Sequence, residues 1–173
     1  QRGKHGLIGV VVFGPFLLLA GVLALAVLPA LWEFMRLPGD AIKGVDRVAT
    51  LLAGTAILAL SAFLPADMLS RTMPSVLAGL CLGLLVLVLF QPQPIEKAGL
   101  RATHMITGLL YVAFLGSFAI LAGRPENGDH GRHVLLFAAA VTWVNDSAAF
   151  FAGKFLGRHK LYPIVSPNKT WEG

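Results

Sequence analysis

Apolar residues gather into long runs along this 173-residue chain. The runs cover residues 7–31, 48–64, 75–90, 105–123 and 134–153, and segments with charged and turn-forming residues separate them. A hydrocarbon core about 30 Å thick needs roughly 17 to 25 residues of helix, which is close to the length of these runs. None of them alternates charged and apolar faces as a helix of a soluble bundle would. The pattern therefore predicts an all-α, polytopic bundle of transmembrane helices.

The first apolar stretch, residues 7–37, allows either one long helix or two short helices that meet near Gly21. Cytoplasmic loops of membrane proteins carry an excess of lysine and arginine. Two helices give six spans with both chain ends in the cytoplasm, and leave few basic residues on the opposite side. Those residues are Arg71, Arg124 and Arg132. One helix would move the basic N-terminus to that side, so the charge distribution favours about six spans, although two crossings in about 30 residues are short.

The composition agrees with a membrane protein, since 56% of the residues are hydrophobic and 13% are charged. An ordinary soluble domain carries about twice that charge. The net charge of +5 could suggest nucleic acid, but the basic residues lie in short loops next to spans, where topology explains them. One such loop is predicted over residues 91–103, with Lys97 and Arg101 on the cytoplasmic side. We expect a lipid bilayer and no nucleic acid as partners.

Asp146 lies inside the last apolar run, where an ionised carboxylate costs at least about 2.5 to 3.5 kcal/mol on insertion scales. The residues on its side of the helix are small or polar: Thr142, Asn145, Ala149 and Gly153. Lys154 follows eight residues later, which places Asp146 in the cytoplasmic half of the bilayer. A functional role, such as holding a metal ion, is expected for such a residue, and a hydrogen bond or ion pair with a neighbouring helix is the alternative.

A basic loop follows this helix from Lys154 to Gly173. Its candidate phosphate ligands are Lys154, Lys160, Ser166, Lys169 and Thr170. Ammonium and hydroxyl groups beside a carboxylate can hold phosphates and a divalent cation. A simple cytoplasmic anchor would also be basic. The GxxxxGK[ST] spacing is absent, so the loop is not an ordinary P-loop.

The stretch NDSAAFFAGKFLGRHKLYPIVSPNKTWEG, residues 145–173, resembles the middle segment of CDP-diacylglycerol synthases, also called phosphatidate cytidylyltransferases. In that family an Asp followed by small residues leads through a GK…GKHKL run to SPxKTxEG. Phe150 stands where the family usually has Tyr. The family's later signature, with KR, KD, HGG and DRxD elements, does not occur in this sequence. The similarity thus predicts N-terminal transmembrane helices over residues 1–133, and a catalytic-segment helix with a cytoplasmic phosphate-binding loop over 134–173.

The resemblance implies cytidylyl transfer from CTP to phosphatidate in phospholipid biosynthesis, which gives CDP-diacylglycerol and pyrophosphate, with Mg²⁺ as cofactor. It implies that Asp146 binds the metal ion and is catalytic, and that Lys169 and Glu172 are catalytic as well. It also implies that four residues bind substrate: Lys154, Lys160, Ser166 and Thr170. The expected location is a bacterial inner membrane with the site facing the cytoplasm. The 173 residues alone are expected to be inactive, because the later carboxylates are missing.

Two other classes of function stay open. A related CTP-dependent membrane lipid enzyme, such as a polyprenol kinase or an ether-lipid cytidylyltransferase, would share the phosphate loop. A non-catalytic membrane scaffold or transport subunit would instead use small-residue faces of its helices. Gly79 and Gly83 form a GxxxG pair that would let helices approach, within one subunit or in a homodimer. His104 is expected near the membrane interface rather than as a ligand.

Overall fold

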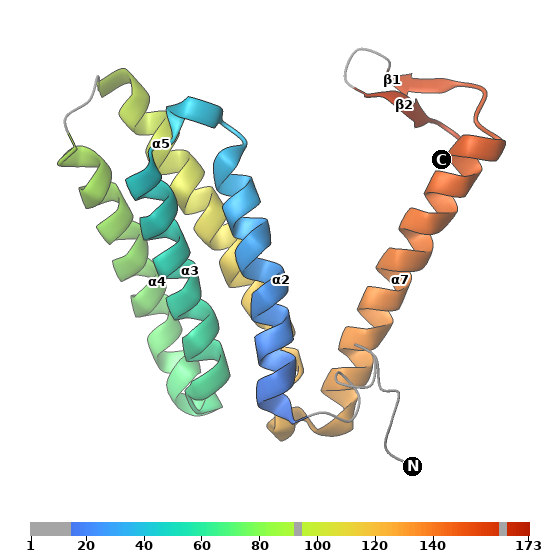
Figure 1. Ribbon diagram of the computed structural model, residues 1–173. Helices are drawn as coiled ribbons and strands as arrows, with labels where there is room; N and C mark the ends of the chain where they lie inside the picture. The colour runs from blue at the N-terminus through green and yellow to red at the C-terminus, as the bar shows by residue number, and fades with distance from the viewer. Residues whose placement is uncertain (1–14, 92–94, 163–165) are drawn as a thin grey trace. The chain divides into compact units, whose positions relative to one another are not determined.

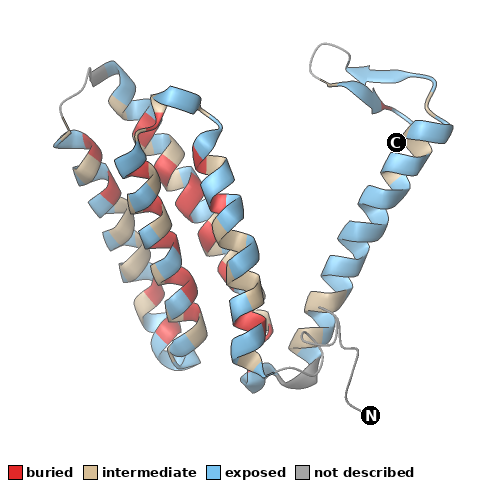
Figure 2. Ribbon diagram, in the orientation of Figure 1, coloured by how far each residue is buried: buried red, intermediate tan, exposed pale blue. Residues whose placement is uncertain are grey.

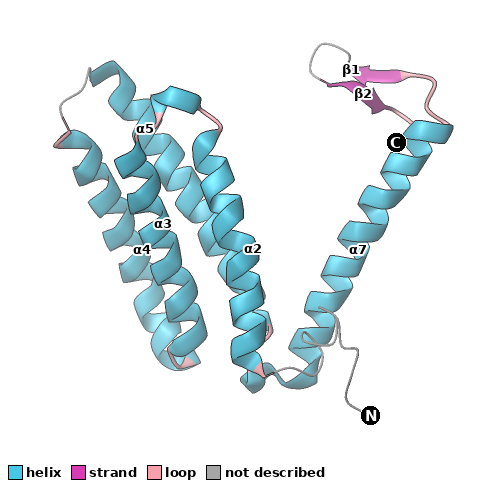
Figure 3. Cartoon of the chain, viewed as in Figure 1, coloured by secondary structure: helices cyan, strands magenta, loops and turns pink. Residues whose placement is uncertain are grey.

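The computed structural model describes residues 15–91, 95–162 and 166–173, which form a series of helices followed by one β-hairpin (Figures 1 and 3). The chain divides into two compact units, residues 1–132 and 133–173. Each unit is described by itself.

The described elements of the first unit are all helical, and short connections join them. Its long helices are α2 (Phe16–Arg36), α3 (Gly44–Phe63), α4 (Ala66–Leu89) and α5 (Ile95–Thr107). The π-helical segment η2 (Gly108–Phe114) and helix α6 (Leu115–Ala122) continue α5, and the short 3₁₀ turns are η1 (Gly39–Ala41) and η3 (Pro125–Asn127). In Figure 1 the long helices lie side by side as a bundle.

The core of this unit lies where α3 packs against α2 and against the rod formed by α5, η2 and α6. Buried residues gather on the inner faces of these helices (Figure 2). Leu31, Ile57 and Leu109 are fully buried there. A Cβ atom at Gly54 would lie 2.6 Å from Leu31 Cδ2 and 3.1 Å from Ala113 Cβ. Glycine at this position therefore allows α3 to approach α2 and η2 closely.

The prediction of an all-α transmembrane bundle is confirmed. Five described helices are long and apolar enough to cross a membrane. They are Phe16–Arg36, Gly44–Phe63, Ala66–Leu89, Glu96–Ala122 and His130–Phe155. The predicted break near Gly21 is wrong, because α2 runs through Gly21 as one helix. One glycine among leucines and alanines costs about 1 kcal/mol and does not end a helix. The position of residues 1–14, on which a sixth span would depend, lies outside the described residues.

The predicted loop over residues 91–103 is a second correction, because helix α5 begins at Ile95. Arg101, Met105 and Leu109 are fully buried, and their spacing of four residues places them on one face of this rod. Arg101 thus belongs to a buried stripe instead of a surface loop. The buried stripe is hard to predict from sequence, because it contains an arginine and charged residues are almost never fully buried unless they are paired.

The second unit contains most of α7 (Gly128–Phe155) and a two-stranded antiparallel hairpin. Its strands are β1 (Lys160–Tyr162) and β2 (Ser166–Thr170), with Lys160 opposite Thr170 and Tyr162 opposite Ser166. The sequence predicts a loop for the basic segment after α7, but the structure has two paired strands there. Backbone N–H and C=O groups of one strand bond to the other strand, whereas in a loop these groups would bond to water.

Candidate functional site

The hairpin packs against the end of α7 through two glycines. Thr170 is 8% exposed and lies against Gly153 and Gly157. A Cβ atom at Gly157 would lie 2.8 Å from Thr170 Oγ1 and 2.1 Å from the Gly153 carbonyl oxygen, and one at Gly153 would lie 3.3 Å from Thr170 Oγ1. Position 157 thus leaves this space for Thr170 only as glycine, whereas a Cβ atom at position 153 would make one tight contact. We call Gly153 and Gly157 the glycine seat.

The residues after β2 continue along the same helix face. The Gly173 N–H donates a hydrogen bond of 3.3 Å to Thr170 Oγ1. A Cβ atom at Gly173 would lie 2.7 Å from the Ala149 carbonyl oxygen and 3.0 Å from Gly153 Cα. Asp146 precedes Ala149 by three residues, so it lies one helical turn further along this face. The end of the hairpin therefore approaches the side of α7 that carries Asp146.

Glu172 and His159 close the base of the hairpin. Glu172 Oε1 lies 2.8 Å from His159 Nδ1, and the His159 backbone N–H donates to Oε1 at 3.3 Å and to Oε2 at 3.4 Å. The Trp171 N–H donates to the His159 carbonyl oxygen at 3.0 Å. Hydrogen bonds from the backbone N–H of Glu172 itself and from His159 lower the pKa of Glu172 from 4.5 to about 2. Glu172 is thus a carboxylate engaged by its own hairpin.

The three candidate lysines are exposed, but they do not share one direction. Lys160 is the cross-strand partner of Thr170, so the two side chains share a face of the hairpin. Lys169 precedes Thr170 in the same strand and therefore points to the opposite face. The Lys154 ammonium lies 5.8 Å from the centre of the Phe150 ring and 5.9 Å from that of Phe155. Ser166 is half-buried opposite Tyr162.

Asp146 stands apart from these groups. It is exposed on α7, and among the described residues it makes no hydrogen bond or ion pair. No three His, Cys, Asp or Glu side chains in the described part of the chain are grouped so that they could hold a metal ion. The structure thus brings Lys160, Thr170 and Glu172 together in one hairpin and places Asp146 on the helix before it. The roles expected for these residues stay predictions.

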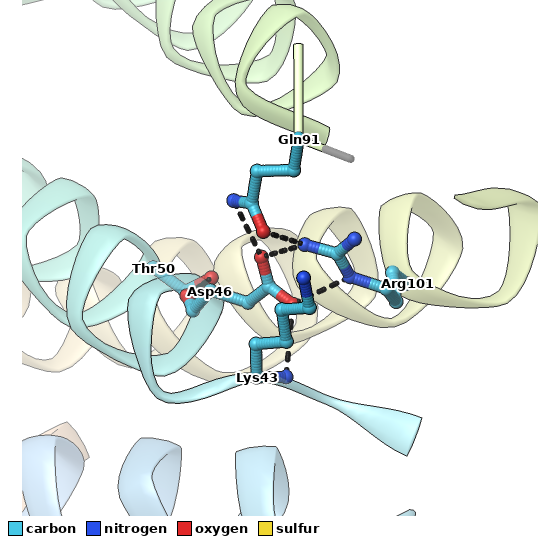
Figure 4. A network of polar contacts seen from close by, with 5 residues as sticks. All are labelled: Lys43, Asp46, Thr50, Gln91 and Arg101. Carbon is cyan, nitrogen blue, oxygen red and sulfur yellow. Dashed lines mark hydrogen bonds and ion pairs between the residues drawn. The ribbon is translucent and has the colours of Figure 1, made fainter. Parts of the chain in front are cut away.

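Sequence reasoning missed a buried polar network in the first unit, which Figure 4 shows. Asp46 on α3 and Arg101 on α5 are both fully buried, and Arg101 donates from Nε to Asp46 Oδ2 at 2.7 Å and from Nη2 to Oδ1 at 2.5 Å. Gln91, just after α4, accepts from Arg101 Nη2 at 2.6 Å. The Lys43 N–H also donates to Asp46, at 3.0 Å. The network links three helices. The apolar spacing around Arg101 could have shown that this side chain is buried, but not which residue it binds.

Two further polar side chains have structural roles in this unit. Arg124 is 5% exposed and donates to the carbonyl oxygens of Ser61 and Leu64, so its guanidinium caps the C-terminal end of α3. The ring of His104 stacks on Phe34 at 4.5 Å, and His104 Nε2 lies 2.9 Å from the Phe34 carbonyl oxygen. A packing role explains His104 without a ligand.

Comparisons with known proteins agree with the resemblance of residues 145–173. A family described as the cytidylyltransferase family matches residues 5–173. The phosphatidate cytidylyltransferase of Staphylococcus saprophyticus is 42% identical over 66 residues, which are 38% of this chain and 24% of the relative. The Staphylococcus haemolyticus protein of the same name is 38% identical over 72 residues, 42% of this chain and 26% of the relative. That of Staphylococcus aureus strain COL is 46% identical over 48 residues, 28% and 18% of the two chains.

The matched part of this chain therefore spans about a quarter or less of each of these relatives. No solved structure matches the chain.

Proposed function

The chain belongs to the cytidylyltransferase family, and we propose on this basis that the protein transfers the cytidylyl group of CTP to phosphatidate. The products would be CDP-diacylglycerol and pyrophosphate. The observation that carries the proposal is the similarity to staphylococcal proteins named phosphatidate cytidylyltransferase. A basic hairpin directly after an apolar helix supports it, because the phosphate of a membrane lipid lies at the headgroup layer, where such a hairpin would emerge.

The reaction joins two anions. A phosphate oxygen of phosphatidate attacks the α-phosphorus of CTP, and the bond from that phosphorus to the bridging oxygen of the β-phosphate breaks. Pyrophosphate leaves with the bonding electrons. The attacking oxygen is already ionised at pH 7, so the reaction needs charge neutralisation and in-line positioning more than a strong base.

The exposed lysines would supply the neutralising charge. Lys160 and Lys169 lie on opposite faces of the hairpin, and so they could serve different phosphate groups. Lys154 would add a third ammonium near the end of α7, and Ser166 a hydroxyl donor. Thr170 is buried in the glycine seat, and its predicted contact with substrate comes second to this packing role.

Mg²⁺ is the cofactor that this reaction calls for. Mg²⁺ is usually held by one or two carboxylates together with substrate phosphates and water. Asp146 offers one exposed carboxylate, so the described residues fit Mg²⁺ only if the phosphates of CTP complete its shell. When bound, Mg²⁺ would neutralise charge on the pyrophosphate that leaves. In the bilayer, a cation beside Asp146 would also offset the cost of an ionised carboxylate there.

Charge supports a cytoplasmic location for the hairpin. If each of the five apolar helices crosses once, the α2–α3 connection, the α4–α5 connection and the hairpin share one side of the membrane. Arg71, Arg124 and Arg132 lie toward the other side, which carries less positive charge. The richer side would be the cytoplasm, where CTP is available, and the bacterial relatives favour a bacterial inner (plasma) membrane.

The test is a substrate comparison with the complete protein in detergent or nanodiscs. CTP with phosphatidate should give CDP-diacylglycerol and one pyrophosphate per lipid. A polyprenol acceptor, or ATP in place of CTP, should give much slower turnover. Phosphorylation of a polyprenol at the expense of CTP, without turnover of phosphatidate, would contradict the proposal and favour a lipid kinase.

A further inference from the structure

The carboxylate of Glu172 makes its side-chain contacts with His159. Its two oxygens receive the His159 backbone N–H, and Oε1 also lies 2.8 Å from Nδ1 of the His159 ring. The Glu172 side chain is 27% exposed, whereas that of His159 is 79% exposed. Most of the hydrogen-bonding capacity of Glu172 is thus directed into the hairpin, and less remains for a metal ion or a substrate.

The Glu172–His159 pair lies where the two strands of the hairpin meet their flanking residues. His159 immediately precedes Lys160 and β1, and Glu172 follows Thr170, the last residue of β2, by two residues. The Trp171 N–H adds a backbone hydrogen bond to the His159 carbonyl oxygen at the same place. Thr170 and Gly173 lie against α7, and β1 is paired with β2 through Lys160 and Thr170. Opening the Glu172–His159 pair would therefore loosen the end of the strand that carries Lys160.

We propose that Glu172 and His159 form a latch that closes the hairpin and sets the positions of Lys160 and Lys169, so that Glu172 is a positioning residue. This inference rests on the proposed function for its effect on turnover, but the latch itself can be tested without any activity. It differs from the expectation that Glu172 orients metal-bound water, since Oε1 is already engaged by the His159 ring and the His159 backbone N–H. The low pKa of Glu172 agrees with a carboxylate held ionised by hydrogen bonds within its own hairpin.

The first test measures the latch directly by amide hydrogen exchange in the complete protein. Glu172→Ala and the milder Glu172→Gln should speed exchange of the Trp171 and Gly173 amides, by about tenfold for Ala and less for Gln, because the base of the hairpin opens. Asn168→Ala, a change at an exposed position of the same hairpin, is the matched control and should leave these amides unchanged. Unchanged exchange in both Glu172 variants would overturn the latch, whatever reaction the protein catalyses.

The second test separates positioning from metal binding by turnover with CTP and phosphatidate. Glu172→Ala and His159→Ala should each lower kcat/KM for CTP by about 10- to 100-fold, because displaced lysines hold phosphates poorly. His159→Ala keeps the His159 backbone N–H, so its loss should be the smaller one, and the double variant should be little worse than Glu172→Ala. The Mg²⁺ concentration for half-maximal activity should be the same in all of them and in Asn168→Ala.

Two results of the second test would overturn the positioning role. One is a Mg²⁺ midpoint that rises severalfold in Glu172→Gln but not in His159→Ala, which would make Glu172 a metal ligand. The other is a double variant whose loss is the product of the two single losses, which would show that the residues act independently. If the parent protein has no activity with CTP and phosphatidate, the proposed function fails, and the exchange measurement still decides on the latch.

Discussion

The charged side chains of this protein differ in burial and in hydrogen bonding. Arg101 and Arg124 are buried and hold helices together, whereas Lys160 and Lys169 are exposed on a hairpin. Glu172 lies between these cases, since it is ionised and engaged by its own backbone N–H and by His159. The charge of a residue alone does not reveal which role it has. What distinguishes them is whether a partner lies within hydrogen-bond distance.

The Glu172 carboxyl should titrate well below the ordinary range of a glutamate. Its pKa is lowered from 4.5 to about 2 in the folded hairpin. Because the folded value lies below the unfolded one, the carboxylate stabilises the hairpin fully above about pH 4.5. That contribution fades as the pH falls toward about 2. A carboxyl carbon NMR titration of the labelled residue should give a midpoint near 2, and a midpoint near 4.5 would show that the hydrogen bonds to His159 are absent.

Removing one member of the buried ion pair should destabilise the helical unit. Asp46→Ala leaves the Arg101 guanidinium buried without its counter-ion, and Arg101 Nη1 already has no hydrogen-bond partner in the described part of the chain. The expected loss is about 3 to 5 kcal/mol in the free energy of unfolding, measured by denaturation in detergent. Asp67→Ala, at the start of α4, is the control and should change little.

A paired replacement separates charge from packing. Asp46→Leu combined with Arg101→Met removes both charges together, and its stability should lie close to that of the parent or above it. A double variant as unstable as Asp46→Ala would contradict this account, because the loss would then come from shape instead of an unpaired charge.

Among the helices and strands, glycines allow neighbouring elements to pack closely against one another. Gly54 lets α3 reach α2 and η2, and the glycine seat lets the hairpin lie on α7. By contrast, Gly79 and Gly83 meet nothing within 4 Å among the described residues. Their GxxxG spacing therefore has no packing partner in the described chain, and a homodimer contact through this face stays a proposal.

The glycine seat gives a prediction at this scale. Gly157→Ala would place a methyl group 2.1 Å from the Gly153 carbonyl oxygen and 2.8 Å from Thr170, so both the backbone at the end of α7 and the hairpin against it must shift. Cytidylyl transfer should fall by about 10- to 100-fold, and the amides of β2 should exchange faster. Gly99→Ala, an exposed position of α5 where the methyl group enters open space, is the matched control. Equal activity in the two variants would show that the seat does not position the hairpin.

Across the whole molecule, the structure could be predicted from sequence where one strong physical effect determines it. A long apolar run inside a bilayer must satisfy its backbone hydrogen bonds within itself, which a helix does, so the spans could be predicted. The break near Gly21 could not be decided from loop charge, because one glycine ends a helix only where other interactions favour a turn. The Asp46–Arg101 pair joins residues 55 positions apart. No local pattern specifies such a partner, and the same holds for Glu172 and His159.

The topology provides a prediction at the same scale. In a Cys81→Ser background, a cysteine at position 168 should react with a membrane-impermeant reagent from the cytoplasmic side. A cysteine at position 126 should react from the other side, because one helix crossing separates α6 from the hairpin. Labelling of both positions from the same side would contradict the assignment of α7 as a membrane span.

We propose that α7 and its hairpin carry cytidylyl transfer, with Asp146 serving the metal ion. The most direct measurement is turnover of CTP and phosphatidate by the complete protein and its Asp146→Asn variant across a Mg²⁺ titration. Thr142→Ala, a change one turn earlier on α7, is the control. We expect a loss of roughly 10² to 10³ in rate for Asp146→Asn, partly restored by high Mg²⁺, and little change for Thr142→Ala. Normal turnover by a well-folded Asp146→Asn protein at every Mg²⁺ concentration would contradict it.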